Sequence, residues 1–168
     1  MKKWVCTVAT AALMLCAVGC TRDKPAETVT DGFTCRVAAV YREMNVEGDL
    51  YCAEDGDLSL TFSLPKSLQG VTLGWDGDEI TLALGDMKMD VPADSVPQSA
   101  LIRCLSRVLT APHGAGSDTD DGYVVKGEVE DTAYTIIFDS ASGLPRSLSV
   151  PDEELEAIFA DCTRLKEK

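Results

Sequence analysis

The residues of this chain that are best suited to chemistry are its cysteines. Four of them lie in the main body of the sequence, at Cys35, Cys52, Cys104 and Cys162. Zinc sites draw their ligands from short, paired spacings, and this sequence has no Cys-x-x-Cys pair and a single histidine. The four cysteines are therefore expected to form up to two disulfides, in any of three connectivities, or to remain buried thiols. We predict no metal site and no cofactor.

The single histidine, His113, begins a loop that is rich in glycine and acidic residues and runs to Asp121. No serine, cysteine or carboxylate stands at a catalytic spacing from His113, so we interpret it as a loop residue and not as a catalyst. The acidic residues do not follow the Asp-x-Asp-x-Asp-Gly pattern of calcium loops. The sequence also lacks the Gly-x-Ser-x-Gly, His-Glu-x-x-His and phosphate-loop motifs. A protein that is not an enzyme is predicted.

The charge of the chain limits its partners. Its 168 residues include 15 Lys and Arg against 28 Asp and Glu, a net charge of −13. Removal of residues 1–19, which carry Lys2 and Lys3, leaves 149 residues and a charge of 13 − 28 = −15. Nucleic acids and anionic headgroups bind through Lys and Arg contacts, so nucleic acid is not an expected partner. A length of 149 residues suits a single domain.

The segment before Cys20 has the composition of an export signal. Lys2 and Lys3 provide a positive start, and Trp4–Val18 is an uncharged, apolar run of 15 residues. That run is shorter than the roughly 20 residues needed to span a bilayer and matches the apolar region of a signal peptide. A small residue, Gly19, then precedes Cys20.

These features resemble the signal of bacterial lipoproteins, whose box of small residues ends at a lipidated cysteine. The resemblance implies that the Cys20 thiol takes a diacylglycerol and that cleavage falls between Gly19 and Cys20. Two acyl chains anchor a protein stably where one does not. We therefore expect an extracytoplasmic protein held to the cell membrane, or to the outer membrane of a Gram-negative cell. Ala17 stands where the box usually has Leu, and Cys16 is unsuitable because it follows the bulky Leu15. An ordinary secretory signal beside a chance cysteine is the alternative.

Alternation of apolar and polar residues predicts β-strands in the rest of the chain. It begins after a polar segment, so that residues 20–31 are interpreted as the lipidated cysteine and a flexible tether, and residues 32–168 as one domain. Turn pairs such as Asp55-Gly56 separate the runs, and Pro65 ends the third. The nine expected strands are 33–42, 46–52, 58–64, 71–75, 80–84, 87–91, 123–129, 133–140 and 144–150.

One helix is predicted, over about residues 96–110. Ser95 and Gln98 are spaced as a capping box, and Pro112 follows the end of the helix. A single apolar stripe at helical spacing is formed by Leu101, Cys104, Leu105, Val108 and Leu109. The residues expected to face away from the core are Arg103, Ser106 and Arg107.

The C-terminal tail is ambiguous. Leu155, Ile158, Phe159 and Cys162 follow helical spacing, and Pro151 with the acidic residues after it suits a helix start. The same segment could instead close the sheet.

These elements predict a mainly β fold, with a strongly curved antiparallel sheet that forms an unclosed barrel and holds the helix in its concave side. Short motifs run through the domain: Leu60-x-Phe62-x-Leu64-Pro65-x-x-Leu68-x-Gly70, Pro97 at the helix, Gly122-x-Val124, Phe138-Asp139 and Gly143-Leu144-Pro145. They resemble the outer-membrane lipoprotein carrier superfamily, and more closely the small, uncharacterised lipoproteins of that superfamily from Gram-positive anaerobes.

The resemblance covers roughly residues 33–165. It implies a half-open barrel with an apolar cavity plugged by helices, and a final strand from Leu155 onward. The carriers themselves are not lipidated, whereas this chain is expected to be.

The favoured function is a membrane-anchored binder of acyl chains or of another apolar ligand, in a pocket on the order of a few hundred Å³ between helix and sheet. Its mouth is expected near residues 65–70 and 112–121. The alternative is a protein-interaction or envelope-sensing module that uses the acidic surface toward an envelope protein. Methionine suits adaptable walls, although Met and Leu in a sheet are also ordinary core residues. The candidate cavity residues are Phe62, Trp75, Leu82, Leu84, Met87, Met89 and Leu105.

Overall fold

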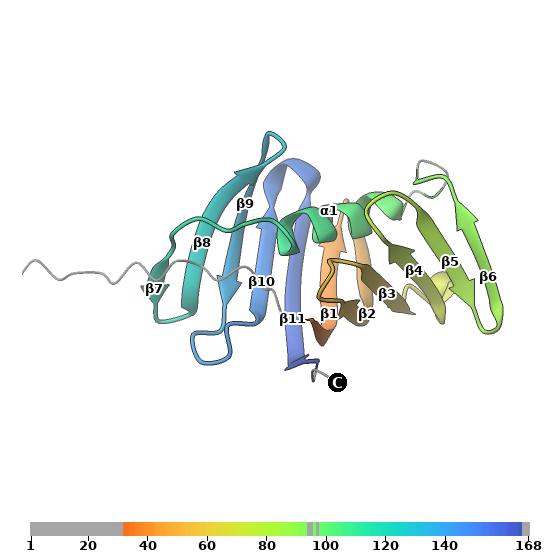
Figure 1. Ribbon diagram of the computed structural model, residues 1–168, viewed down its shortest axis with the longest axis horizontal. Coiled ribbons are helices and arrows are strands. Elements are labelled where there is room, and N and C mark those ends of the chain that lie inside the picture. The colour runs from red at the N-terminus through yellow and green to blue at the C-terminus, as the bar shows by residue number, and fades with distance from the viewer. Residues whose placement is uncertain (1–31, 94–95, 97, 166–168) are drawn as a thin grey trace, which may run out of the picture.

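The computed structural model describes residues 32–93, 96 and 98–165. Most of these residues form one antiparallel sheet of 11 strands, and the helix α1 (Ser99–Leu109) crosses its concave side (Figure 1). The mainly β, unclosed fold with one helix is therefore confirmed. The strands are β1 (Phe33–Tyr41), β2 (Met44–Cys52), β3 (Leu58–Leu64), β4 (Val71–Trp75), β5 (Ile80–Leu84), β6 (Met87–Val91), β7 (Ser117–Thr119), β8 (Gly122–Val129), β9 (Thr132–Phe138), β10 (Pro145–Val150) and β11 (Leu155–Arg164), with 3-10 turns η1 (Lys66–Leu68) and η3 (Pro151–Glu153).

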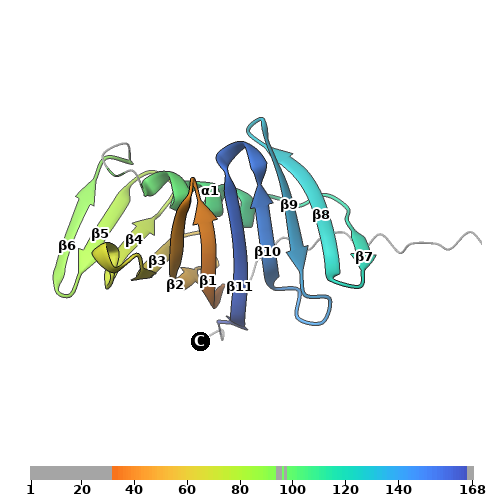
Figure 2. The ribbon, with the colours of Figure 1, turned by 180° about the vertical axis from the view of Figure 1, so that it is seen from behind.

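The sheet consists of two meanders that meet at its centre. The strand order is β6-β5-β4-β3-β2-β1-β11-β10-β9-β8-β7, so the first strand pairs with the last (Figure 2). We call this β1–β11 junction the seam. The outermost strands, β6 and β7, lie at opposite ends of the sheet and leave the barrel open.

Alternation along the strands produces one buried face. In β1, the residues Phe33, Cys35, Val37, Ala39 and Tyr41 are all buried. A two-residue turn joins β1 to β2, since Arg42 and Glu43 both have positive φ angles (47° and 66°). Such turns match the twist of the strands they connect. Strand β2 therefore begins at Met44, within the segment predicted to be the turn.

Helix α1 is buried on almost every side. Its predicted stripe of Leu and Val residues is buried, and so is Ile102. Ser106 is buried as well, which corrects the expectation that it faces away. The helix begins at Ser99 with Gln98 as its N-cap, so the predicted capping box is wrong. The hydroxyl of Ser99 instead donates to the carbonyl of Ala93.

The tail is a strand, as the family resemblance implied, and the helical interpretation is wrong. Leu155, Ala157 and Phe159 are buried, whereas Ile158 is 64% exposed. That is the period of a strand, because a helical stripe would have buried Ile158 with Leu155. Pairing with both β1 and β10 satisfies the backbone of this segment. The acidic loop also holds a short edge strand, β7, that alternation did not predict.

The expected signal peptide, cleavage site and tether lie outside the described residues, and their assignments stay predictions. Within the part of the chain that the structure describes, no helix is both long and apolar enough to cross a membrane.

Candidate apolar binding face

Helix α1 covers only part of the concave side of the sheet. It packs against β3 and β4, and Leu105 at its centre is fully buried. The guanidinium of Arg103 lies 5.7 Å from the ring centre of Trp75, a cation–π contact at the border of the covered area. The strands beyond β4 extend past the helix toward the β6 edge (Figure 1).

The apolar side of the sheet continues where the helix ends. Residues directly opposite each other on neighbouring strands share one face. The three rows across these strands are Val71–Leu84–Met87, Leu73–Leu82–Met89 and Trp75–Ile80–Val91. We call these nine residues the β4–β6 face.

Exposure rises toward the free edge along two of the three rows, whereas in the third Ile80 is fully buried. Leu73 is buried, Leu82 is half-buried and Met89 is 59% exposed. In the neighbouring row, Leu84 is 47% exposed and Met87 is 68% exposed. The apolar inner face of the sheet therefore continues from the buried core to a solvent-exposed apolar surface on β5 and β6.

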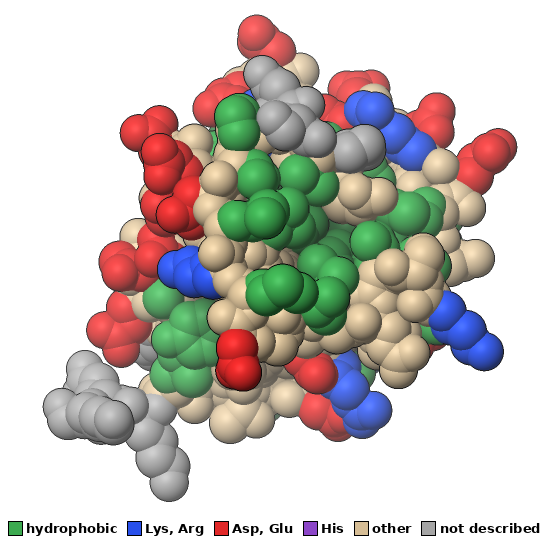
Figure 3. All heavy atoms as spheres, turned by 90° about the vertical axis from the view of Figure 1, so that its right-hand side faces the viewer, with side chains coloured by type: hydrophobic (Ala, Val, Ile, Leu, Met, Phe, Trp, Pro, Cys, Tyr) green, Lys and Arg blue, Asp and Glu red, His purple; other side chains and the backbone are tan. Residues whose placement is uncertain are grey.

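Figure 3 looks onto this end of the molecule and shows apolar side chains gathered in the middle, with acidic side chains around them. The turns at the two ends of the face supply exposed carboxylates: Asp76, Asp78 and Glu79 at one end and Asp86 at the other. The loop before β4 borders the face, since a Cβ on Gly70 would lie 3.7 Å from Cδ1 of Leu84.

The predicted cavity residues fall into three groups. Phe62 and Leu105 belong to the packed interior. Trp75 and Leu82 are half-buried at the margin of the helix. Leu84, Met87 and Met89 are exposed, as described above, and lie on the same face as Trp75 and Leu82.

The two loops expected at the cavity mouth do not lie together. Residues 65–70 adjoin the β4–β6 face, whereas residues 112–121 lead into β7 at the opposite end of the sheet. The sequence did not predict this separation. Alternation identifies the strands but not their order in the sheet, and the order decides which loops lie at the same end.

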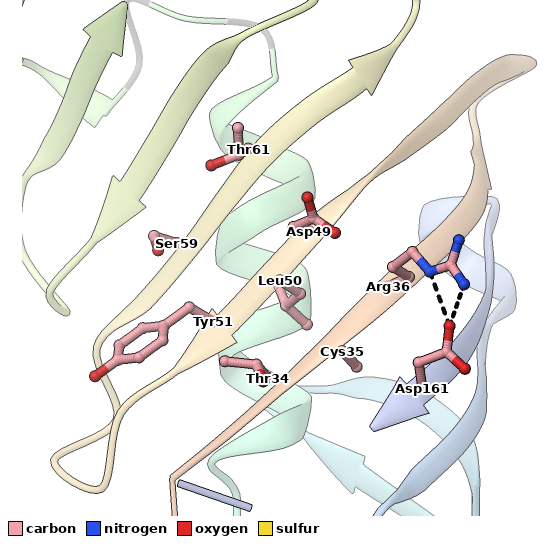
Figure 4. A pocket seen from close by; sticks show the side chains of 9 residues that line it. All are labelled: Thr34, Cys35, Arg36, Asp49, Leu50, Tyr51, Ser59, Thr61 and Asp161. Carbon is pink, nitrogen blue, oxygen red and sulfur yellow. Dashed lines mark hydrogen bonds and ion pairs between the residues drawn. The ribbon is translucent and has the colours of Figure 1, made fainter. Parts of the chain in front are cut away.

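A shallow cleft of about 320 Å³ lies on the other side of the sheet, across β1 to β3 and β11 (Figure 4). Apart from Tyr51, its exposed residues are polar, and the Arg36 guanidinium binds the Asp161 carboxylate, with Nε to Oδ2 at 2.9 Å. Exposed ion pairs contribute little to stability. The residues that line this cleft are Thr34, Cys35, Arg36, Asp49, Leu50, Tyr51, Ser59, Thr61 and Asp161. None of the predicted cavity residues lines it.

His113 is buried, although its place in a loop suggested otherwise. Its Nδ1 lies 3.0 Å from the hydroxyl of Tyr134, and its ring meets Tyr134 and Phe138 edge to face. Its Nε2 has no hydrogen-bond partner among the described residues. Burial lowers the pKa of His113, so the ring is neutral at pH 7 and serves packing.

The four cysteines of the domain are free thiols in the structure. Burial raises the pKa of Cys52 and of Cys104 to about 11 each, so neither is a ready nucleophile at neutral pH. The described residues contain no group of three or more His, Cys, Asp or Glu side chains that could hold a metal ion.

No protein-family model and no curated protein sequence matches this chain. Similar solved structures exist. An uncharacterized conserved protein from Thermus thermophilus superposes with a TM-score of 0.51 and 12% identity, over 86% of this chain and 85% of that chain. A putative outer membrane lipoprotein-sorting protein domain from Vibrio parahaemolyticus gives a TM-score of 0.44 and 11% identity, over 84% and 90% of the two chains. A LolA superfamily protein from Nitrosomonas europaea gives 0.41 and 8%, over 86% and 91%. At these identities, what this chain shares with the Thermus thermophilus protein is its fold.

Proposed function

We propose that this protein binds acyl chains, or another elongated apolar ligand, on the β4–β6 face while it is anchored outside the cytoplasm. The observation that carries the proposal is the exposure of Leu84, Met87 and Met89 in rows that begin in the core at Leu73 or packed against it at Val71. Exposed apolar area that is continuous with a core is a common feature of binding surfaces.

The side chains of the face suit a flexible ligand. Methionine has three rotatable bonds and a polarizable sulfur, so it adapts to chains of different shape. Trp75 provides a rigid aromatic wall on β4, opposite Ile80 on β5 and two strands from the methionines of β6. Such a surface would select ligands by the length of their apolar chain and not by the structure of the headgroup.

The acidic turns add a charge preference. Asp76, Asp78 and Glu79 at one end of the face and Asp86 at the other repel an anionic headgroup lying near them. We therefore expect zwitterionic or cationic lysolipids to bind more tightly than fatty-acid anions of equal chain length, and the difference to shrink as salt is added.

The anchoring part of the proposal rests on the N-terminal sequence. In it, Cys20 carries the lipid, cleavage follows Gly19, and residues 21–31 connect the membrane to the domain. Coil scaling gives such a linker a reach on the order of 15–20 Å. That distance keeps the β4–β6 face close to the membrane that would supply its ligand.

Trp75 is a natural probe for the test. The purified protein is titrated with a lysophosphatidylcholine below its micelle concentration while tryptophan fluorescence is followed. A saturable change that Trp75→Phe removes supports the proposal. The variant also controls for the other tryptophan, Trp4, in any preparation that retains the signal. A flat titration of a folded sample contradicts it.

A second function, protein interaction, is favoured by the free edge. Strand β6 ends the sheet, and an unpaired edge strand can pair with an extended peptide. Isotope-labelled protein would then show peptide-induced shifts along β6 backbone amides, without any response to lysolipid.

A further inference from the structure

The strand register brings two of the four cysteines together at the seam. On β1 and β11, Thr34 stands opposite Thr163 and Arg36 stands opposite Ala160. One residue of β1, Cys35, therefore faces two residues of β11, Asp161 and Cys162. This is a β-bulge, with an extra residue on one strand.

The bulge decides which side chain meets Cys35. Along β11 the buried positions are Leu155, Ala157 and Phe159, so a regular strand would next turn position 161 inward. Asp161 instead has a positive φ of 53°, and its carboxylate turns outward to Arg36 (Figure 4). Cys162 takes the inward position, is half-buried and packs against the core.

Facing positions on paired antiparallel strands have Cα atoms about 4.5–5.5 Å apart. Disulfides form where the Cα separation is about 4.4–6.8 Å and both side chains lie on the same face. Cys35 is buried on the inner face and Cys162 turns to the same face beside it, so the bulge makes the two thiols neighbours across the seam.

The other two possible partners of Cys35 lie farther from it. Cys52 stands opposite Phe33 and is thus a diagonal neighbour of Cys35, at a Cα distance of about 7–8 Å. Cys104 lies near Tyr41, whose pKa it affects. Tyr41 is six residues along β1 from Cys35, or about 20 Å.

We propose that Cys35 and Cys162 form a disulfide across the seam when the protein meets a small disulfide oxidant, such as oxidised glutathione. One thiolate attacks the oxidant, forms a mixed disulfide and releases one glutathione thiolate. The second cysteine, as thiolate, attacks the protein sulfur of that mixed disulfide and releases another. Two protein thiols are oxidised and one glutathione disulfide is reduced to two glutathiones.

The surroundings identify Cys162 as the attacking group. It is the more exposed of the two, and its thiol donates to the carbonyl of Pro145 at 3.3 Å. Burial raises the pKa of Cys162, and the neighbouring Cys35 thiol offsets part of that rise. Burial and the neighbouring Cys162 raise the pKa of Cys35. Exchange is therefore expected to be slow at neutral pH and faster under mildly alkaline conditions.

The bond would join the two meanders covalently. Without it, the seam is held by backbone pairing and packing between β1 and β11 and by the exposed Arg36–Asp161 ion pair. The loop it closes runs from residue 35 to residue 162, nearly the whole domain, and long loops give the largest stabilisation in the chain-entropy account. The oxidation state of Cys35 and Cys162 would then determine how readily the two meanders separate at the seam.

The test equilibrates the purified full chain in glutathione redox buffers, alkylates free thiols in denaturant, and maps the peptides by mass spectrometry. We expect a cross-linked peptide that contains Cys35 and Cys162, lighter than the two reduced peptides by two hydrogens. It should vanish in Cys35→Ala and in Cys162→Ala and persist in the matched controls Cys52→Ala and Cys104→Ala. The melting temperature of the oxidised protein should rise on the order of 10 °C.

Three results would overturn the proposal. One is complete alkylation of Cys35 and Cys162 after equilibration with excess oxidised glutathione. Another is a cross-link that involves Cys52 or Cys104 instead. The third is a stable mixed disulfide with glutathione on Cys162 that does not close onto Cys35. The wild-type peptide map decides each case, so a variant that fails to fold does not obscure the answer.

Discussion

Replacing Met87 and Met89 together by serine should weaken binding without unfolding the domain. Full burial of a methionine side chain stabilises by about 1.5–3 kcal/mol. Met87 is 68% exposed and Met89 is 59% exposed, so most of that energy is unused in the free protein. Scaling by these fractions leaves about 2–4 kcal/mol for the pair when a ligand covers both residues completely.

A ligand that covers half of this exposed area recovers about 1–2 kcal/mol from the two residues. The double substitution Met87→Ser, Met89→Ser should then raise Kd roughly 5- to 30-fold. The loss of stability should be small, since most surface substitutions stay within about 0.5 kcal/mol each. We expect the melting temperature to change by no more than about 3 °C.

The assay is the Trp75 fluorescence titration with lysophosphatidylcholine, alongside thermal unfolding followed by circular dichroism. Ile158→Ser is the matched control, because Ile158 is 64% exposed but lies on the outer side of β11. It removes a similar apolar area far from the β4–β6 face and should leave Kd unchanged.

Three outcomes would refute this reasoning. An unchanged Kd in a folded double variant would show that the ligand binds elsewhere. A fall in melting temperature of more than about 10 °C would show that the two methionines stabilise the fold itself. An equal loss of binding in Ile158→Ser would mean that the effect is not local to the face.

Three further predictions follow from other parts of the chain. Because burial lowers the pKa of His113 from 6.5, its contribution to stability is complete above pH 6.5 and falls as the pH drops toward the folded-state pKa, by about 1.4 kcal/mol per pH unit for one proton. Urea unfolding between pH 7 and pH 5 should show this slope in the wild type and lose it in His113→Phe; equal slopes would place the titrating group elsewhere. Leu105→Asp puts an uncompensated charge in the core and should cost several kcal/mol, so an unchanged melting temperature would show that α1 is peripheral. Cys20→Ala should leave an uncleaved precursor that takes up no labelled fatty acid, and labelling of that variant would contradict the lipoprotein assignment.

The sequence alone predicted most of the secondary structure. Period-two alternation is a local property, so runs such as Leu58–Leu64 could be recognised without knowledge of their neighbours. The stripe on α1 was equally clear, since Leu101, Leu105 and Val108 recur at helical spacing and are all buried. The curved, unclosed sheet followed from the need of these elements to bury one face around one helix.

Prediction from local pattern failed where the same residues fit both the helical and the strand period. The tail from Leu155 matched helical spacing, yet it is a strand because it fills the gap between β1 and β10 and satisfies their backbone groups. The predicted start of the helix was also wrong. The hydroxyl of Ser99 donates to the carbonyl of Ala93, and this contact depends on the path of the chain before the helix, which residue spacing does not predict.

The candidate site depended most on tertiary structure. The sequence could place Trp75, Leu82 and Met89 on one apolar face, but not tell which of them the helix would cover. Exposure depends on where α1 ends relative to β4 and on the order of the strands. The three cysteine connectivities were likewise indistinguishable until the bulge at Asp161 turned Cys162 toward Cys35, because facing across a sheet is a property of register and not of spacing.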